Sequence, residues 1–128
     1  MQYKNNPLSP HLQIYKWQIS SLLSIAHRIV GVINILAITL ICIWVSSLFL
    51  GEENYEITKL FLNSFFGKFV LISLCWTFSF HILNEIRHLA WDVGFGFDLK
   101  VAKITGNLAL FGSFFLTILF YIVGNSFF

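Results

Sequence analysis

The stretch IVGVINILAITLICIWVSSLFL, residues 29–50, contains no charged side chain and few polar ones. A helix of roughly 20 apolar residues crosses the hydrocarbon core of a bilayer, so this stretch is long enough to span a membrane. The apolar character extends backwards over residues 19–30, where His27 and Arg28 interrupt it. We therefore expect a spanning helix over about residues 20–50.

Two further stretches have the same character. Residues 69–84 carry no charge and follow the aromatic run 61–66, with Lys68 between, and residues 104–128 are also uncharged. In lipid, backbone polar groups must be bonded within the protein, which favours helices. The sequence predicts an all-α transmembrane bundle with three spanning helices at about residues 20–50, 61–90 and 104–126, forming one membrane-anchor domain over residues 1–128.

Composition supports a lipid-facing surface. The chain is 57% hydrophobic and only 11% charged, whereas soluble domains average about 25% charged residues. The formal charge of +2 and the lack of a basic block argue against nucleic acid as a partner. Cys42 and Cys75 fall in different apolar stretches, so we interpret them as small buried hydrophobes and expect no disulfide. The polar N-terminus predicts no cleavable signal peptide.

The distribution of basic residues predicts the orientation. Lysine and arginine accumulate on the cytoplasmic side of membrane proteins. The stretch GEENYEITK, between the first two predicted helices, is mostly acidic. We therefore expect the N-terminus inside and the C-terminus outside, with residues 1–18 at the inner membrane surface. The basic residues on that inner side are Lys4, Lys16, Arg28, Arg87, Lys100 and Lys103.

Polar residues recur at helical spacing in the first two predicted helices, which should place them on one face of each helix. Because consecutive spanning helices run antiparallel, we expect His27, Arg28 and His81 at similar depth. The first stripe consists of Ser20, Ser24, His27, Arg28, Gly31 and Asn34, and the second of Ser73, Thr77, His81, Glu85 and His88.

These stripes suggest chemistry. An arginine inside a span costs about 2.5–3.5 kcal/mol on insertion scales, so Arg28 needs a partner, a cofactor or water, although snorkelling to the inner surface would also suffice. His81 either bonds a neighbouring carbonyl or holds haem iron. Haem iron takes a second ligand on the side opposite the first, and His88, about 10 Å further along the same helix as His81, cannot provide it. The second ligand would come from His27 or from another chain.

The remaining polar residues leave several interpretations open. Arg87 and His88 either complement the helix dipole or meet haem propionates. Asp92 is best described as a solvated acid. Ser24 and Arg28, one turn apart, are suited to donating hydrogen bonds to a quinone carbonyl. From the residues alone, a redox anchor, a proton relay and an ion path all remain open.

At these residues the chain resembles a known family, the cytochrome b subunits that anchor succinate dehydrogenase (complex II) in the membrane. Three segments carry the resemblance: PLSPHLQIYKW at 7–17, SIAHR at 24–28 with Gly31, and the pattern H-x-x-x-x-I-R-H-L-x-W-D-x-G from His81 to Gly94. The segments occur in the family's order, and the resemblance covers the whole chain.

The resemblance implies roles for individual residues. His81 matches the axial ligand of haem b, with the opposite ligand supplied by a second small membrane-anchor subunit. His27, Arg28 and His88 match the haem propionate side. Ser24 and Arg28 match the ubiquinone site, and Asp92 becomes a candidate proton relay.

The resemblance also implies a function. The chain would pass electrons from an iron–sulfur subunit to ubiquinone, with succinate chemistry in a flavoprotein subunit, and would not be catalytic alone. It would lie in lipid, in a mitochondrial inner membrane or a bacterial cytoplasmic membrane. The alternatives are a haem-free structural anchor and a small proton- or ion-conducting helical subunit.

Three positions depart from the family's pattern. Asn6 replaces an arginine, Val30 replaces a small hydroxyl residue, and Glu85 replaces a small residue, usually glycine. A glutamate one turn after His81 adds bulk and charge beside the expected cofactor. We expect it to pair with Arg28 or His88 and haem to be retained.

Overall fold

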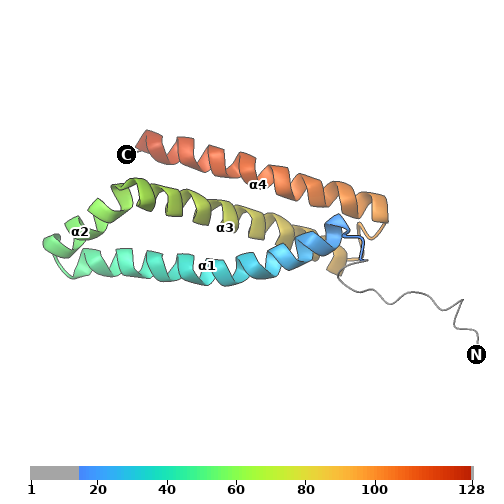
Figure 1. Ribbon diagram of the computed structural model, residues 1–128, viewed down its shortest axis with the longest axis horizontal. Helices are drawn as coiled ribbons and strands as arrows, with labels where there is room; N and C mark the ends of the chain where they lie inside the picture. The colour runs from blue at the N-terminus through green and yellow to red at the C-terminus, as the bar shows by residue number, and fades with distance from the viewer. Residues whose placement is uncertain (1–14, 128) are drawn as a thin grey trace, which may run out of the picture.

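The computed structural model describes residues 15–127, which form four helices (Figure 1). These are α1 (Ile19–Phe49), α2 (Glu52–Asn63), α3 (Phe65–Asp92) and α4 (Leu99–Phe127). Within this part of the chain, α1, α3 and α4 are long and apolar enough to cross a membrane. The predicted three-span, all-α fold is confirmed. Residues 1–14, most of the predicted inner-surface segment, lie outside the described residues.

Helix α3 is the centre of the bundle. It runs antiparallel to α1 and packs against both α1 and α4, and α2 joins α1 to α3 at one end (Figure 1). We call this end the α2 end; the C-terminus of the described chain lies there too. The opposite end, where α1 begins and α3 ends, is the histidine end. Three spans would place the start of α1 and the end of α4 on opposite sides of a bilayer.

The predicted start of the second spanning helix, at about residue 61, is too early, because α3 begins at Phe65. Instead of one helix over 61–90, the structure has a break at Ser64, whose extended backbone (φ −64°, ψ 159°) separates α2 from α3. The Ser64 hydroxyl oxygen accepts a hydrogen bond from the backbone N–H of Gly67 at 3.0 Å, which caps the first turn of α3. The acidic stretch before it is helical, with Glu52 and Glu53 in the first turn of α2, where the helix dipole favours negative charge.

Gly67 is required by the close contact at this break. A Cβ atom at this position would collide with the carbonyl oxygen of Phe61 and would lie 2.9 Å from Cα of Leu62. Both are backbone atoms, which cannot move aside without shifting α2. The sharp turn between α2 and α3 therefore requires a residue without a side chain at position 67.

The bundle interior is mostly polar, with a small apolar cluster around Phe80, whereas most large apolar side chains point outward, for example Phe65 at 90% exposure and Phe111 at 70%. This inversion suits lipid, in which helices associate through small residues and hydrogen bonds. Between α1 and α3, the Thr77 hydroxyl donates to the side-chain oxygen of Asn34 at 3.0 Å. The buried polar residues are Asn34, Ser47, Thr77, Ser79, Asn84, Arg87, Ser113 and Thr117.

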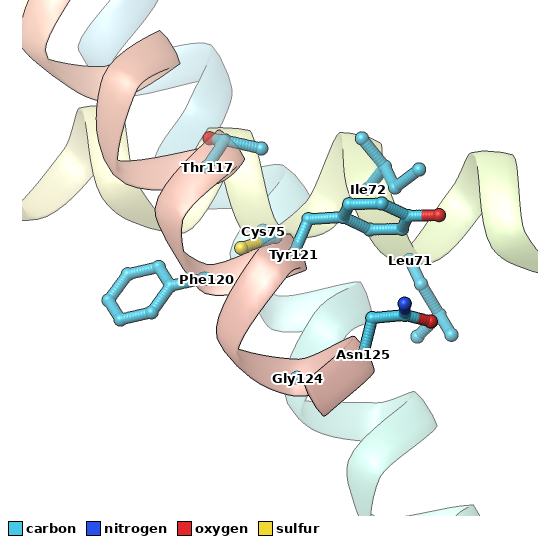
Figure 2. A pocket seen from close by; sticks show the side chains of 8 residues that line it. All are labelled: Leu71, Ile72, Cys75, Thr117, Phe120, Tyr121, Gly124 and Asn125. Atoms are coloured by element: carbon cyan, nitrogen blue, oxygen red, sulfur yellow. The ribbon is translucent and has the colours of Figure 1, made fainter. Parts of the chain in front are cut away.

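Two hollows lie towards the α2 end. One is a groove of about 280 Å³ between α3 and α4 (Figure 2), lined by Leu71, Ile72, Cys75, Thr117, Phe120, Tyr121, Gly124 and Asn125. The other, of about 320 Å³, lies between α1, α2 and α3 and includes Asn34, Trp44 and Phe78. Neither is lined by a histidine. Both cysteines are free, as predicted, but Cys42 is exposed and Cys75 only half-buried, so the interpretation of both as buried residues was wrong.

The contact at Gly67 gives a test of the fold. We expect Gly67→Ala to lower the free energy of unfolding by about 1–3 kcal/mol, the usual cost of overpacking. Gly124→Ala is the matched control, because nothing lies within 4 Å of a Cβ atom at that position. Thermal unfolding of the detergent-solubilised protein measures both. Equal midpoints for the two variants would contradict the proposed role of Gly67.

Candidate functional site

Two histidines from neighbouring helices meet at the histidine end. The imidazole rings of His27 on α1 and His81 on α3 stack with centroids 4.3 Å apart and an interplanar angle of 17°. Gly31, one turn after His27, makes room for this stack, because a Cβ atom there would lie 3.4 Å from Cε1 of His81. The prediction that His27 and His81 lie at similar depth is confirmed.

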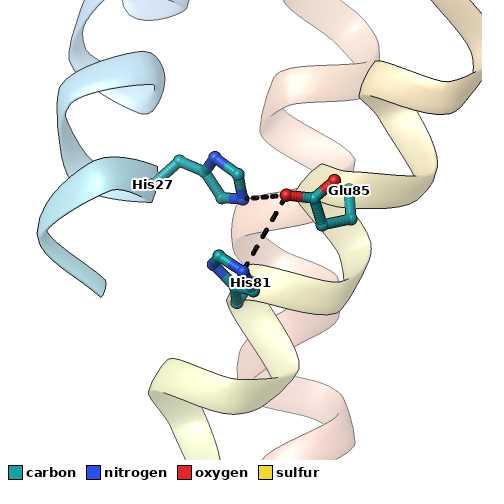
Figure 3. A group of neighbouring side chains, drawn as sticks. All are labelled: His27, His81 and Glu85. Atoms are coloured by element: carbon teal, nitrogen blue, oxygen red, sulfur yellow. Dashed lines mark ion pairs between the residues drawn. The ribbon is translucent and has the colours of Figure 1, made fainter. Parts of the chain in front are cut away.

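Glu85 completes the cluster (Figure 3). Its Oε1 lies 3.2 Å from Nε2 of His27 and 3.8 Å from Nε2 of His81. The expectation that Glu85 pairs with Arg28 or His88 was therefore wrong. Residues four apart on a helix share a face, so Glu85 lies directly beside His81, and the α1–α3 contact brings His27 to the same level.

His88 extends the cluster to three rings, which we call the histidine stack: His81, His27 and His88. The His88 ring lies 5.1 Å from that of His27 at an angle of 19°. Its Nδ1 hydrogen-bonds the backbone carbonyl of Asn84 at 2.7 Å, one turn earlier on the same helix. This bond and an edge contact with Trp91 fix the ring, so Nδ1 of His88 is not available to Glu85.

The polar atoms of the cluster are incompletely satisfied. Nε2 of His27 and Nδ1 of His81 are buried and form no hydrogen bond with the described residues. Nε2 of His27 is close to the Glu85 carboxylate without hydrogen-bond geometry. Buried polar atoms without partners are rare in native proteins and call for an explanation. The side chains of His81 and Glu85 are 30% and 50% exposed, so the cluster opens to one side of the chain.

This arrangement can bind a metal. Ligand atoms of His27, His81 and Glu85 all lie within 4.8 Å of one another, and neutral imidazole is the commonest metal ligand in proteins. The stacked rings of His27 and His81 cannot bind opposite sides of one iron, since axial nitrogens must face each other roughly 4 Å apart across the metal. Among the described residues 15–127, a haem at His81 therefore lacks its second ligand.

The predicted stripe of α1 divides into two parts. His27, Gly31 and Asn34 face α3, whereas Arg28 is exposed and does not join the histidine stack. Ser24, one turn before Arg28, is half-buried. Asp92 is the last residue of α3 and is exposed. Ser24 and Arg28 thus lie on the flank of α1, beside the histidine stack.

Arg87 faces α4 and not the histidines. It is buried, and its guanidinium donates to the carbonyl oxygen of Ala102 at 3.0 Å and to the hydroxyl of Thr105 at 3.3 Å. The guanidinium carbon also lies 4.2 Å from the centroid of the Trp91 ring, in a cation–π contact. The idea that Arg87 meets haem propionates is not supported, because these bonds direct it into the α3–α4 interface.

Asn84 is a structural residue that the sequence stripe omitted. It is fully buried, and its amide nitrogen lies 3.5 Å from the carbonyl oxygen of Leu23 on α1. Its side-chain oxygen accepts a long hydrogen bond from Arg87, also at 3.5 Å. A side-chain amide inside an apolar span is costly unless it forms hydrogen bonds. The presence of an asparagine in this apolar stretch could therefore have predicted an interhelical contact.

The chain matches the family model described as the succinate dehydrogenase/fumarate reductase transmembrane subunit over residues 2–120. The chain belongs to this family. Members are respiratory membrane subunits, and with its three apolar helices the chain is an integral inner-membrane protein and a membrane anchor of the succinate dehydrogenase complex.

Three relatives illustrate the relationship. The succinate dehydrogenase cytochrome b556 subunit of Rickettsia felis is 40% identical over 120 residues, covering 94% of each chain. The cytochrome b556 subunit of Paracoccus denitrificans is 31% identical over 93% of this chain and 92% of its own. The cytochrome b560 subunit of Reclinomonas americana is 36% identical, with 93% and 86% covered. The similarity therefore extends over nearly the whole length of each relative.

The bonds of Arg87 give a stability prediction. We expect Arg87→Met, which keeps much of the apolar bulk, to lower the free energy of unfolding by about 2 kcal/mol, since it removes bonds from a charged donor to buried acceptors. Lys103→Met is the control, because it also removes one positive charge at the histidine end, but from an exposed side chain on α4. Thermal unfolding in detergent compares them. A midpoint for Arg87→Met equal to that of Lys103→Met would contradict the structural role.

Proposed function

We propose that this chain is the cytochrome b subunit that holds haem b through His81 and presents ubiquinone to Ser24 and Arg28. The observation that carries the proposal is the histidine stack, in which His81 is packed on one face and open on another at the end where Ser24 and Arg28 lie. The names of the relatives, which are cytochrome b subunits, support a haem.

The residues of the site fit a haem b. His81 offers an imidazole whose Nδ1 forms no bond to the described residues and whose Nε2 lies 3.8 Å from the carboxylate of half-exposed Glu85. His27 and His88 lie beside it, on the side proposed for the propionates, and exposed Arg28 adds a positive charge. When bound, haem b supplies a one-electron centre near the quinone. Because His27 is parallel to His81, the opposite ligand belongs to a second small anchor subunit.

Ser24 and Arg28 act on the quinone. The hydroxyl and the guanidinium, one turn apart on α1, donate hydrogen bonds to a quinone carbonyl and stabilise negative charge as it develops on that oxygen. Asp92, exposed at the end of α3, connects this region to water as a proton relay.

The histidine end faces the inner side, where it meets the iron–sulfur subunit and, through it, the flavoprotein subunit. This proposal rests on the positive-inside rule. Lys100 and Lys103 lie at the histidine end, at the start of α4, whereas Glu52 and Glu53 lie in the first turn of α2 at the other end. Residues 1–18 would lie against the iron–sulfur subunit on the inner side.

The distribution of titratable groups disfavours an ion-conducting subunit. An ion path needs polar groups that connect both sides of the membrane. Towards the α2 end, the buried hydroxyls of Ser47 and Thr117 donate to carbonyl oxygens of their own helices. The ionisable residues buried or clustered within the described spans, His27, His81, Glu85, Arg87 and His88, are all near the histidine end.

The haem assignment is tested by a reduced-minus-oxidised visible spectrum of the detergent-purified complex. We expect a b-type band in the wild type that His81→Ala abolishes, because the substitution removes the axial nitrogen. Asn107→Ala, which changes a half-buried residue on α4, is the control and should keep the band. An intact wild-type complex without the band would favour the haem-free structural anchor.

The quinone assignment is tested by two activities of the same complex. We expect Ser24→Ala and Arg28→Met to lower kcat/KM for ubiquinone reduction by about tenfold or more, the value of roughly one hydrogen bond in the transition state. Succinate oxidation with a soluble artificial acceptor should be unchanged, because the flavoprotein is not altered. Ser46→Ala, exposed on α1 towards the α2 end, is the control. Equal loss of both activities would indicate faulty assembly and contradict the assignment.

A further inference from the structure

The carboxylate of Glu85 occupies the side of His81 from which iron would be bound. Nε2 is the nitrogen of His81 nearest to a partner group, and that partner is Oε1 of Glu85 at 3.8 Å. Nδ1 is buried on the other side of the ring, against Gly31. A metal approaching His81 from the open side of the cluster therefore meets Glu85 first.

Glu85 is able to leave this position. Its side chain is 50% exposed, and its shorter contact, at 3.2 Å, is with His27 and not with His81. Giving up His81 thus leaves the closer of its two contacts intact. A half-exposed ion-pair contact contributes little to stability, so Glu85 can be displaced from His81 at a small cost in free energy.

We propose that Glu85 is a positioning residue that competes with haem iron for His81: its carboxylate holds the imidazole when haem is absent and must be displaced when haem binds. This inference rests on the proposed role of His81. Haem held at Nε2 of His81 would take the place of the Glu85 carboxylate beside that nitrogen. The proton of the neutral ring then resides on Nδ1, and no electron is transferred.

Competition has a kinetic consequence. When the iron–His81 bond opens transiently, Glu85 returns to Nε2 and delays rebinding, so haem escapes more readily than it would without the carboxylate. Removing the side chain should slow the loss of haem.

The test is haem transfer from the purified complex to excess apomyoglobin, followed by visible absorption. We expect Glu85→Ala to lose haem about three- to tenfold more slowly than the wild type, and Glu85→Gln, which keeps the size without the charge, to lie between them. Asp98→Asn is the matched control, since it removes one exposed carboxylate at the same end without contacting the histidines. The position of the reduced band should be the same in all variants, because His81 remains the ligand.

The outcomes separate this inference from the haem assignment. Equal rates of haem loss in the wild type, Glu85→Ala and Glu85→Gln, or faster loss in the variants, would overturn the competition while leaving His81 as the ligand. Haem present in Glu85→Ala but absent from the wild type would support competition in its strongest form. No haem in any of these proteins would overturn both the assignment of His81 and the inference.

Discussion

Lipid offers no hydrogen bonds, and this constraint organises the whole bundle. Every polar side chain within the spans has to find a partner on its own helix or a neighbour. Helix α3 meets this need on two sides: Thr77, His81 and Glu85 face α1, whereas Arg87 faces α4. Asn84 lies between these two sets and contacts both α1 and Arg87. The central position of α3 follows from its having polar contacts with both α1 and α4.

The same constraint explains why the polar groups of the candidate site are only partly covered and bonded by the described residues. His81 is partly exposed, Arg28 is exposed on α1, and two buried imidazole nitrogens form no bond to the described residues. Exposed polar groups in a span are costly in lipid, so this flank is suited to a protein surface or a cofactor. A partner subunit that covers it would complete the ligand set and bury Arg28 in one step. Under the proposed function, binding of that subunit would therefore also complete the site.

Average properties of the sequence predicted the three spans well, because hydropathy over some 20 residues is insensitive to any single contact. The antiparallel arrangement and the regular rise of a helix were sufficient to bring His27 and His81 together. The break at Ser64 was missed, since it depends on one capping hydroxyl and on the absent side chain of Gly67. Periodicity does not reveal which neighbour packs on which side of a helix. For that reason the partner of Glu85 and the direction of Arg87 required the structure.

Helix α4 is held unevenly along its length. At the histidine end, Arg87 fastens it with hydrogen bonds to Ala102 and Thr105, and near its middle Phe114 stacks on Trp76 with ring centroids 5.3 Å apart. Beyond this, the α3–α4 contact widens into the groove beside Cys75 and Tyr121 (Figure 2). Because these contacts lie at the histidine end and near the middle of α4, a tilt imposed by bilayer thickness would displace mainly the C-terminal end of the helix. Such a tilt would change the width of the groove more than the arrangement of the histidine stack.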